Sequence, residues 1–326
     1  MKTRETFFLC TAISMLRGVL MAFSLFGANS FQEACHKGAG ARVIFRVLND
    51  VGSPVVGAKV NVFLDMADRG GGRRVIGITD TNGVCVVEGK TVGVLKIEVT
   101  REGYYRSTDR ISFITMGHEH EVKNGNWQPW GMVRQITLLP VKNPVAQIAG
   151  ASDWKWTKEL YTWIGFDLMK YDFVEPHGVG KVSDMEVMFE WDGAWRQKEY
   201  KGMALKIRFP VKFAGGYYVD KIAGSEYSGV YHAKTNGNYK SEFSFSDQVA
   251  ARDKRGRVTS WSRNFFDSSK ILVVRSRCEF DENGTLKTAN YFQLSDIQYA
   301  CDERGAAVMF SSIYNPVPND TNLEPK

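Results

Sequence analysis

The sequence has few of the residues that carry metal and nucleophilic chemistry. Its 326 residues include five cysteines and five histidines. No CxxC pair or Cys/His cluster is present, which argues against a zinc site. The GxSxG turn of hydrolases and the GxxxxGK[ST] loop that cradles phosphates are also absent. The sequence therefore predicts no catalytic residue, no metal and no cofactor, and it favours a protein that is not an enzyme.

Composition excludes two further classes. The net charge of +6 is spread without a basic run or stripe, so we do not expect nucleic acid as a partner. Hydrophobic residues make up 44% and charged residues 24% of the chain, which is ordinary for a globular protein and excludes a disordered one. A length of 326 residues suggests two domains.

The first thirty residues have the pattern of a secretory signal peptide. A charged MKTRE segment precedes an apolar stretch, and small residues stand at positions 27, 28 and 30. Arg17 divides the apolar stretch into pieces too short to anchor the chain across a bilayer of about 30 Å. We predict a signal peptide over 1–30, export to the periplasm, cell surface or extracellular space, and no membrane span after its removal. A start at Met15 is an alternative that also predicts export.

Four cysteines lie beyond this leader, enough for two disulfides in an exported protein. Cys278 and Cys301 fall beside the two turns of a predicted three-stranded meander, at opposite ends of its middle strand. A disulfide needs Cα atoms within about 7 Å, so these two do not pair unless Ser295-Asp296 breaks that strand. Cys35 and Cys85 could pair, but Cys85 fits better as a small core residue. The disulfide state stays open.

Residues 41–105 alternate apolar runs with clusters of Gly, Pro, Asn and Asp. The runs 42–48 (RVIFRVL) and 59–64 (KVNVFL) show the period of two that is typical of half-buried strands. Asn82-Gly83 lies between two further apolar runs and predicts a hairpin turn. Strands that recur about every ten residues, with turn signals between them, indicate a β-sandwich.

This stretch resembles the carboxypeptidase-regulatory-like family. The resemblance rests on three pieces, D-x-G-x-P-V-x-G-A-x-V, T-D-x-x-G and E-G-Y-Y. The matching residues are Asp50, Gly52, Pro54, Val55, Gly57, Ala58, Val60, Thr79, Asp80, Gly83, Gly103 and Tyr104. It implies a seven-stranded, Ig-like or prealbumin-like sandwich over 41–142, which ends at the stiff connector 140–144 (PVKNP). Domains of this kind serve as spacers, chaperoning elements or binding modules, so the resemblance implies no functional residue.

Residues 143–326 predict a second, β-rich domain. The expected strands are 185–191, 205–213, 229–234, 240–246, 271–280, 285–300 and 306–314. Asp281-Glu282-Asn283-Gly284 predicts a hairpin turn between two of them. The best helix candidate, 156–171, is weakened by Gly165. We therefore expect a mostly antiparallel sheet and an all-β chain.

Two stretches of this second region carry another resemblance. Residues 165–187 (GFDLMKYDFVEPHGVGKVSDMEV) and 315–324 (NPVPNDTNLE) are similar to a group of uncharacterised secreted bacterial proteins. Members of that group place a regulatory-like sandwich in front of a β-rich module. The resemblance implies this architecture and export, and it implies no activity.

All eight tryptophans lie between positions 127 and 261. Flat aromatic faces can stack on sugar rings, while the alternative is that these side chains pack the core. The candidate binding residues are Trp154, Trp156, Trp191, Trp195 and His177. We expect a non-enzymatic structural or binding component of the bacterial periplasm or cell surface, with a glycan or another envelope protein as partner.

The rival interpretation is a hydrolase acting on envelope or dietary polysaccharide. Several carboxylates near His177 could supply general acid and base, or could instead hydrogen-bond loop backbone. They are Asp167, Asp172, Glu175, Asp184 and Glu186. A hydrolase would show carboxylates converging in a pocket, whereas a binding protein would show exposed aromatic side chains on a flat face or edge.

Two oxygen- or imidazole-rich stretches are candidate metal sites. His118-Glu119-His120 places two imidazoles on one face of an extended chain without a third ligand nearby, so we expect a solvated loop. The tail 315–324 offers hard oxygen ligands but lacks the spacing of an EF-hand. We expect this tail to lie across the last strand, with its Asn and Asp side chains capping turns.

Overall fold

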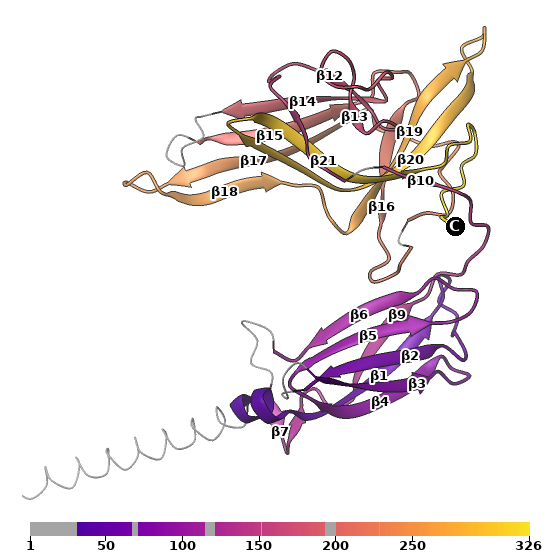
Figure 1. Cartoon of the computed structure of the whole chain (residues 1–326), viewed down its shortest axis with the longest axis vertical. Coiled ribbons are helices and arrows are strands. Elements are labelled where there is room, and N and C mark those ends of the chain that lie inside the picture. Colours follow the sequence, from indigo (N-terminus) through magenta and orange to yellow (C-terminus); the bar gives the residue numbers. More distant parts are fainter. Residues whose placement is uncertain (1–30, 67–70, 115–120, 151, 193–199, 228) are drawn as a thin grey trace, which may run out of the picture. The chain divides into compact units, whose positions relative to one another are not determined.

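The computed structural model describes residues 31–66, 71–114, 121–150, 152–192, 200–227 and 229–326. Strands dominate these ranges, and their one helix spans residues 31–37 (Figure 1). The all-β class predicted from the sequence is confirmed. The chain divides into two compact units, the first Met1–Val141 with Gly224–Tyr227, and the second Lys142–Ala223 with Ser228–Lys326.

The first unit is a sandwich of two sheets. One sheet has the order β4-β1-β8-β7 with β9 also paired to β1, and the other has the order β3-β2-β5-β6. The strands are β1 (Ala39–Leu48), β2 (Lys59–Asp65), β3 (Gly72–Ile78), β4 (Val84–Thr91), β5 (Val94–Thr100), β6 (Ser107–Ser112), β7 (Val122–Lys123), β8 (Asn126–Trp127) and β9 (Met132–Thr137). β1 runs antiparallel to β4 and parallel to β9.

The period of two in the sequence explains how the sandwich closes. Val43, Phe45 and Val47 of β1 are fully buried, and the residues between them point outward. Alternate residues of β2 join the same core from the other sheet, as the inner faces of a sandwich do. Cys85 is 7% exposed and belongs to this core, as predicted.

The predicted turn at Asn82-Gly83 is confirmed. The amide of Gly83 donates to the carbonyl of Asp80 at 3.0 Å, and the amide of Asp80 donates to the carbonyl of Val84 at 2.9 Å. Gly83 has a φ of 70°, in the left-handed region that glycine adopts at low cost.

The second unit also contains two sheets, and all its strand ladders are antiparallel within the described ranges. One six-stranded sheet has the order β13-β12-β14-β15-β17-β18; the other has the order β10-β21-β20-β19-β16 with β11 on β21. The strands are β10 (Ile148–Ala149), β11 (Lys155–Thr157), β12 (Ile164–Asp167), β13 (Asp172–Phe173), β14 (Met185–Asp192), β15 (Gly202–Arg208), β16 (Gly215–Asp220), β17 (Glu242–Arg252), β18 (Val258–Asn264), β19 (Lys270–Phe280), β20 (Leu286–Asp302) and β21 (Gly305–Tyr314). A core that includes Phe166, Phe189 and Phe292 lies between them.

One expectation for this unit is wrong. Residues 229–234 do not join a sheet, because they hold the C-terminal tail: Ala233 donates to the carbonyl of Thr321, and Leu323 donates to the carbonyl of Tyr231. The weak helix candidate 156–171 overlaps β11, contains β12 and forms no helix, in keeping with the expected all-β chain. The predicted hairpin turn at 281–284 is present, with Gly284 donating to the carbonyl of Asp281 at 2.9 Å.

The four described cysteines are unpaired. β20 does carry an irregularity between Ser295 and Gln298, yet Cys278 and Cys301 remain separate thiols. None of the described residues forms a helix with the length and hydropathy needed to span a membrane.

Candidate functional site

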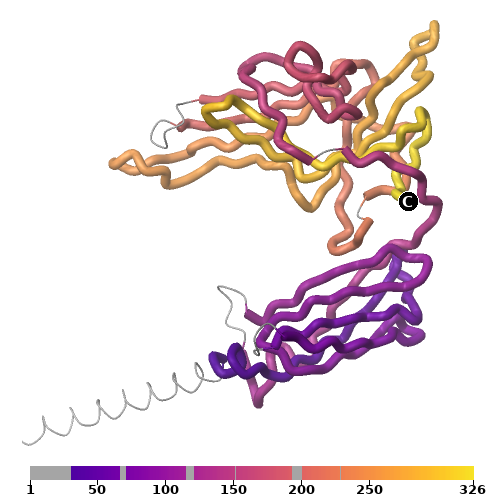
Figure 2. The backbone as a smooth tube through the Cα atoms, viewed as in Figure 1, coloured from indigo at the N-terminus to yellow at the C-terminus, as the bar shows by residue number. Residues whose placement is uncertain are grey.

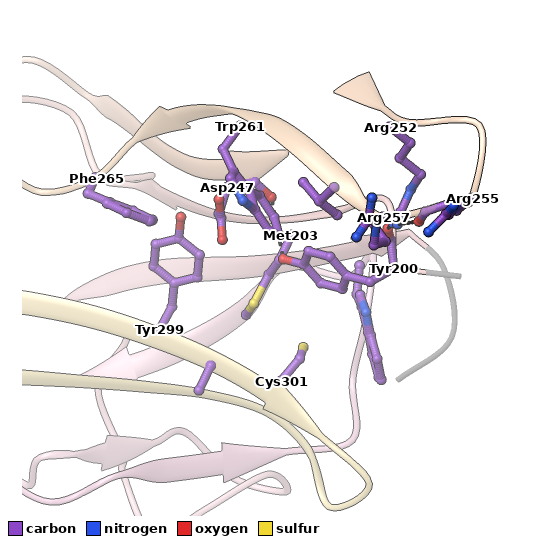
Figure 3. A pocket seen from close by; sticks show the side chains of 14 residues that line it. Tyr200, Met203, Asp247, Arg252, Arg255, Arg257, Trp261, Phe265, Tyr299 and Cys301 are labelled. Atoms are coloured by element: carbon purple, nitrogen blue, oxygen red, sulfur yellow. Dashed lines mark hydrogen bonds between the residues drawn. The ribbon is translucent and has the colours of Figure 1, made fainter. Parts of the chain in front are cut away.

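At one end of the second unit, its two sheets leave a cavity of about 1130 Å³ between them. We call it the aromatic groove. Five aromatic side chains and three arginines line it, with Met203, Asp247 and Cys301 among the other lining residues. The aromatic residues are Trp191, Tyr200, Trp261, Phe265 and Tyr299, and the arginines are Arg252, Arg255 and Arg257 (Figure 3).

The groove forms where the apolar core ends. On β17, Phe243 and Phe245 are buried, but the residues after Phe245 are half-buried or exposed. The pairing of β17 with β18 shifts between Val249 and Arg252, and such bulges bend and twist a hairpin. The β17–β18 hairpin projects past its neighbours (Figure 2). The two sheets therefore leave a gap at this end that aromatic rings line.

The aromatic rings follow the length of the groove. Tyr200 and Trp261 have ring centroids 5.9 Å apart, and Phe265 and Tyr299 have centroids 6.2 Å apart. The three arginines gather at one end, and Phe265 and Tyr299 lie at the other (Figure 3). Trp261 is 39% exposed and Phe265 is 51% exposed, so these ring surfaces are accessible to a ligand.

Asp247 of the groove lining and Asp253 of the neighbouring β17–β18 turn are each held by an arginine. Asp247 accepts a hydrogen bond from Arg263 at 3.0 Å, and Asp253 accepts one from Arg257 at 2.8 Å. Arg263 also lies over the ring of Trp261, 4.8 Å from its centroid. These pairs neutralise the acidic side chains at this end of the unit.

Two arginines at the groove have no carboxylate partner. Arg252 donates to the carbonyl of Gly256 at 2.8 Å and to the carbonyl of Tyr200. The guanidinium of Arg255 has no ion-pair or hydrogen-bond partner among the described residues. The arginine end of the groove therefore carries net positive charge.

The hydroxyl and thiol groups of the groove stay protonated at neutral pH. Burial, reinforced by Asp247, raises the pKa of Tyr200 to about 12. Burial also raises the pKa of Tyr299 above its ordinary value. Burial, with a contribution from Asp302, raises the pKa of Cys301 to about 12. A thiol with so high a pKa is a poor nucleophile, so Cys301 contributes an apolar wall rather than a reactive group.

Two polar atoms beside the groove lack a partner. Neither the Tyr299 hydroxyl nor the Trp191 indole nitrogen has a hydrogen-bond partner within the described part of the chain. Buried polar groups are usually hydrogen-bonded, and leaving one unsatisfied costs about 1–3 kcal/mol. Both atoms are buried, so the surface that the groove offers a ligand consists mainly of its ring faces and its arginines.

Of the five candidate binding residues, the structure places Trp191 in the groove. Trp156 pairs with Ala307 on β21, whereas Cys301 pairs with Ala306. Because successive residues of a strand point to opposite faces, Trp156 stands on the face of the sheet away from Cys301. Trp156 packs there beside Trp154, with centroids 6.4 Å apart, and under the guanidinium of Arg304, 3.7 Å from its ring centroid.

The histidine candidate does not line the groove. His177 is exposed in a turn outside it, with its Nδ1 atom 3.9 Å from a carboxylate oxygen of Glu159. Trp195 lies outside the described residues, as do His118, Glu119 and His120.

The carboxylates near His177 are engaged in structural contacts. The Asp167 carboxylate accepts hydrogen bonds from the backbone amides of residues 169, 170, 181 and 182. Asp184 accepts from the amide of Leu168 and the hydroxyl of Ser276, and Arg277 bonds both carboxylates. Asp172 accepts from two loop amides. These contacts occupy the acidic groups that the hydrolase interpretation requires.

The oxygen-rich tail is likewise used in hydrogen bonds. The buried carboxylate of Glu324 accepts from the backbone amides of Lys142 at 2.7 Å and Asn143 at 2.6 Å. The side chain of Asn322 donates to the carbonyl of Asn143 at 2.7 Å. No group of three side chains that could bind a metal occurs in the described ranges.

The basic part of the groove was missed in the sequence. Four of the six residues at 252–257 (RDKRGR) are Arg or Lys, which corrects the expectation that the chain has no basic run. The cluster surrounds an Asp-x-x-Gly turn, and this combination of turn and charge is the signal that could have identified it. The aromatic part could not be found this way, because its residues come from separate strands.

No protein-family model matches the chain, and no curated protein matches it. Among solved structures, it is similar to a DUF3823 family protein from Parabacteroides merdae, with 8% identity over 86% of this chain and 98% of that chain and a TM-score of 0.20. A shaft pilin from Lactobacillus rhamnosus GG has 10% identity over 73% of this chain and 86% of that chain, with a TM-score of 0.23.

The chain is also similar to 3-chlorocatechol 1,2-dioxygenase from Rhodococcus opacus, with 13% identity and a TM-score of 0.26. That match covers 32% of this chain and spans 61% of the length of the dioxygenase. These similarities assign no activity to the chain.

Proposed function

We propose that the chain is an exported, non-enzymatic glycan-binding component of the bacterial periplasm or cell surface, and that the aromatic groove is its binding site. The observation that carries this proposal is the lining of the groove by five aromatic rings. Flat rings present the large apolar faces on which sugar rings stack, and the polar tips of Tyr and Trp can hydrogen-bond hydroxyl groups.

The acidic groups favour binding over hydrolysis. Glycosidases use two carboxyl groups separated by roughly 5–10 Å. Among the described lining residues, Asp247 is the single carboxylate, and Arg263 holds it in an ion pair. The groove thus supports recognition of a sugar without the pair of acids needed to cleave it.

The first unit serves as a spacer or docking module in this proposal. Its seven longer strands, in two face-packed sheets, suit the carboxypeptidase-regulatory-like resemblance found in the sequence. The leader at 1–30 is proposed to direct export.

The test is a glycan array probed with the protein obtained by expressing the full-length chain. We expect a restricted set of bound glycans, and no shortened product when a bound glycan is incubated with the protein and analysed by mass spectrometry. Cell fractionation should place the protein outside the cytosol. Absence of any bound glycan would refute the binding role, and release of shorter sugars would establish the hydrolase.

A further inference from the structure

We infer that the ligand of the aromatic groove is an acidic glycan, whose anionic group lies against Arg252 and Arg255 while its sugar rings lie on the aromatic residues. This inference rests on the proposed function and narrows it to saccharides that carry a carboxylate, sulfate or phosphate group.

The charges around the groove give the first reason. Asp247 and Asp253 are each neutralised by one arginine. Arg252 and Arg255 remain without a carboxylate partner within the described ranges. A neutral ligand would leave both positive charges without an anionic partner, whereas an anion would form charge-assisted hydrogen bonds with them, which are roughly twice as strong as neutral ones.

The guanidinium of Arg252 and the backbone at Arg255 are also held at defined positions. The carbonyls of Gly256 and Tyr200 fix the guanidinium of Arg252. Asp253 organises the hairpin tip, because its side chain accepts from the amides of Arg255 at 2.8 Å and Arg257 at 2.9 Å. Gly256, with a φ of 78°, completes the turn. The guanidinium of Arg252, held in this way, loses less freedom when it binds a planar or tetrahedral anion.

The position of the charge relative to the rings gives the second reason. The arginines gather at one end of the groove, Trp261 lies between them and Phe265, and Phe265 and Tyr299 lie at the other end (Figure 3). The ligand must therefore present an anionic group at one end and a stackable surface beyond it.

Acidic glycans paired with their neutralised counterparts test the inference. The probes are uronic-acid, sialic-acid, sulfated and phosphorylated glycans, each arrayed beside its carboxyl-reduced, desulfated or dephosphorylated form. We expect at least tenfold tighter binding of the acidic member, with affinity falling as NaCl rises from 50 to 300 mM. The class that is bound also identifies the chemical source of the anion.

Two variants connect the preference to the named arginines. Arg255→Gln should lower affinity for the acidic member about tenfold and leave the neutral member unchanged. Arg252→Gln should do the same, with thermal unfolding measured to establish that it folds. Arg74→Gln, which removes an exposed arginine of the first unit, is the matched control and should change nothing.

The remaining outcomes separate this inference from the proposed function. Equal binding of acidic and neutral members would overturn the inference and leave glycan binding intact. Binding of no glycan would overturn both. Competition by hexaglutamate or by single-stranded oligothymidylate at the affinity of the acidic glycan would also overturn the inference, because the groove would then recognise a peptide or a nucleic acid.

Discussion

The guanidinium of Arg277 donates to the carboxylate of Asp167 at 2.7 Å, although 110 positions separate the two residues. Asp167 ends β12 in one sheet of the second unit, and Arg277 lies on β19 in the other. The same guanidinium bonds Asp184 at 3.0 Å. Arg277 thus joins the two sheets of the second unit through a partly enclosed ionic cluster.

Removing one partner of this cluster should strongly destabilise the second unit. Asp167→Asn leaves Arg277 with an incomplete set of acceptors, and breaking a buried ion pair costs about 3–5 kcal/mol. Chemical denaturation should show a loss of this size. Asp153→Asn is the control, because Asp153 forms an exposed pair with Lys155 that should contribute under about 1 kcal/mol. Equal effects of the two substitutions would contradict the structural role of Asp167.

The alkaline stability of the first unit should depend on Cys85. Burial, with a smaller contribution from Asp80, raises the pKa of Cys85 from 9.0 to about 11. Because the folded protein favours the neutral thiol, the contribution of Cys85 to stability is complete below pH 9 and is lost as the pH rises from 9 towards 11. The free energy of unfolding of Cys85→Ala should therefore fall less over that interval than that of the unchanged protein, and the difference should be roughly 1 kcal/mol at pH 10. Parallel pH profiles for the two proteins would disprove this.

Substitution of Gly83 should cost more than substitution of another left-handed glycine. A Cβ atom at Gly83 would lie 2.5 Å from the carbonyl oxygen of Val47, whereas one at Gly52 would meet nothing within 4 Å. Both residues have a positive φ, which costs an alanine about 1–2 kcal/mol. Gly83→Ala should exceed Gly52→Ala by at least about 1 kcal/mol in thermal or chemical unfolding. Similar losses would show that the turn can shift to accommodate the methyl group.

Binding should depend on Trp261 and not on Trp156. Trp261 lines the groove, whereas Trp156 lies under Arg304 on the other face of its sheet. Trp261→Ala should weaken glycan binding at least tenfold, or about 1.4 kcal/mol, and Trp156→Ala should leave it within twofold in calorimetric titrations. The reverse result would move the site to the surface that Trp154 and Trp156 share.

The tail should stabilise the start of the second unit through one carboxylate. Glu324 is 1% exposed and accepts from the amides of Lys142 and Asn143. Glu324→Gln replaces one acceptor oxygen with a donor, which leaves a backbone amide unsatisfied at a cost of about 1–3 kcal/mol. Glu282→Gln, at an exposed hairpin turn, should have no measurable effect. Limited proteolysis can reveal whether the tail detaches in the first variant.

Local patterns in the sequence predicted the local parts of the fold. Asn82-Gly83 and Asp281 to Gly284 identified hairpins, because the residues that determine such turns are adjacent. Residues 229–234 resemble a strand equally well, but their backbone groups bond a tail about ninety positions later. Nothing near the segment signals that partner.

The aromatic groove could not be predicted from the sequence for the same reason. Trp191, Trp261 and Tyr299 become neighbours only through the order of the strands in two sheets. The proximity of Trp154 and Trp156 in the sequence suggested a platform, but β11 pairs with β21 and places Trp156 on the opposite face from Cys301. The spacing of residues in the sequence shows which of them share a face of a strand. It does not show which residues of another strand or sheet lie opposite that face.

The parallel pairing of β1 with β9 has a mechanical consequence. The two strands lie side by side over six residue pairs, from Val43 and Met132 to Leu48 and Thr137. Force pulling the amino end of β1 away from the carboxyl end of β9 acts along these strands, in shear, and loads their hydrogen bonds together instead of opening them one by one. The first unit is therefore built to resist tension transmitted along the polypeptide.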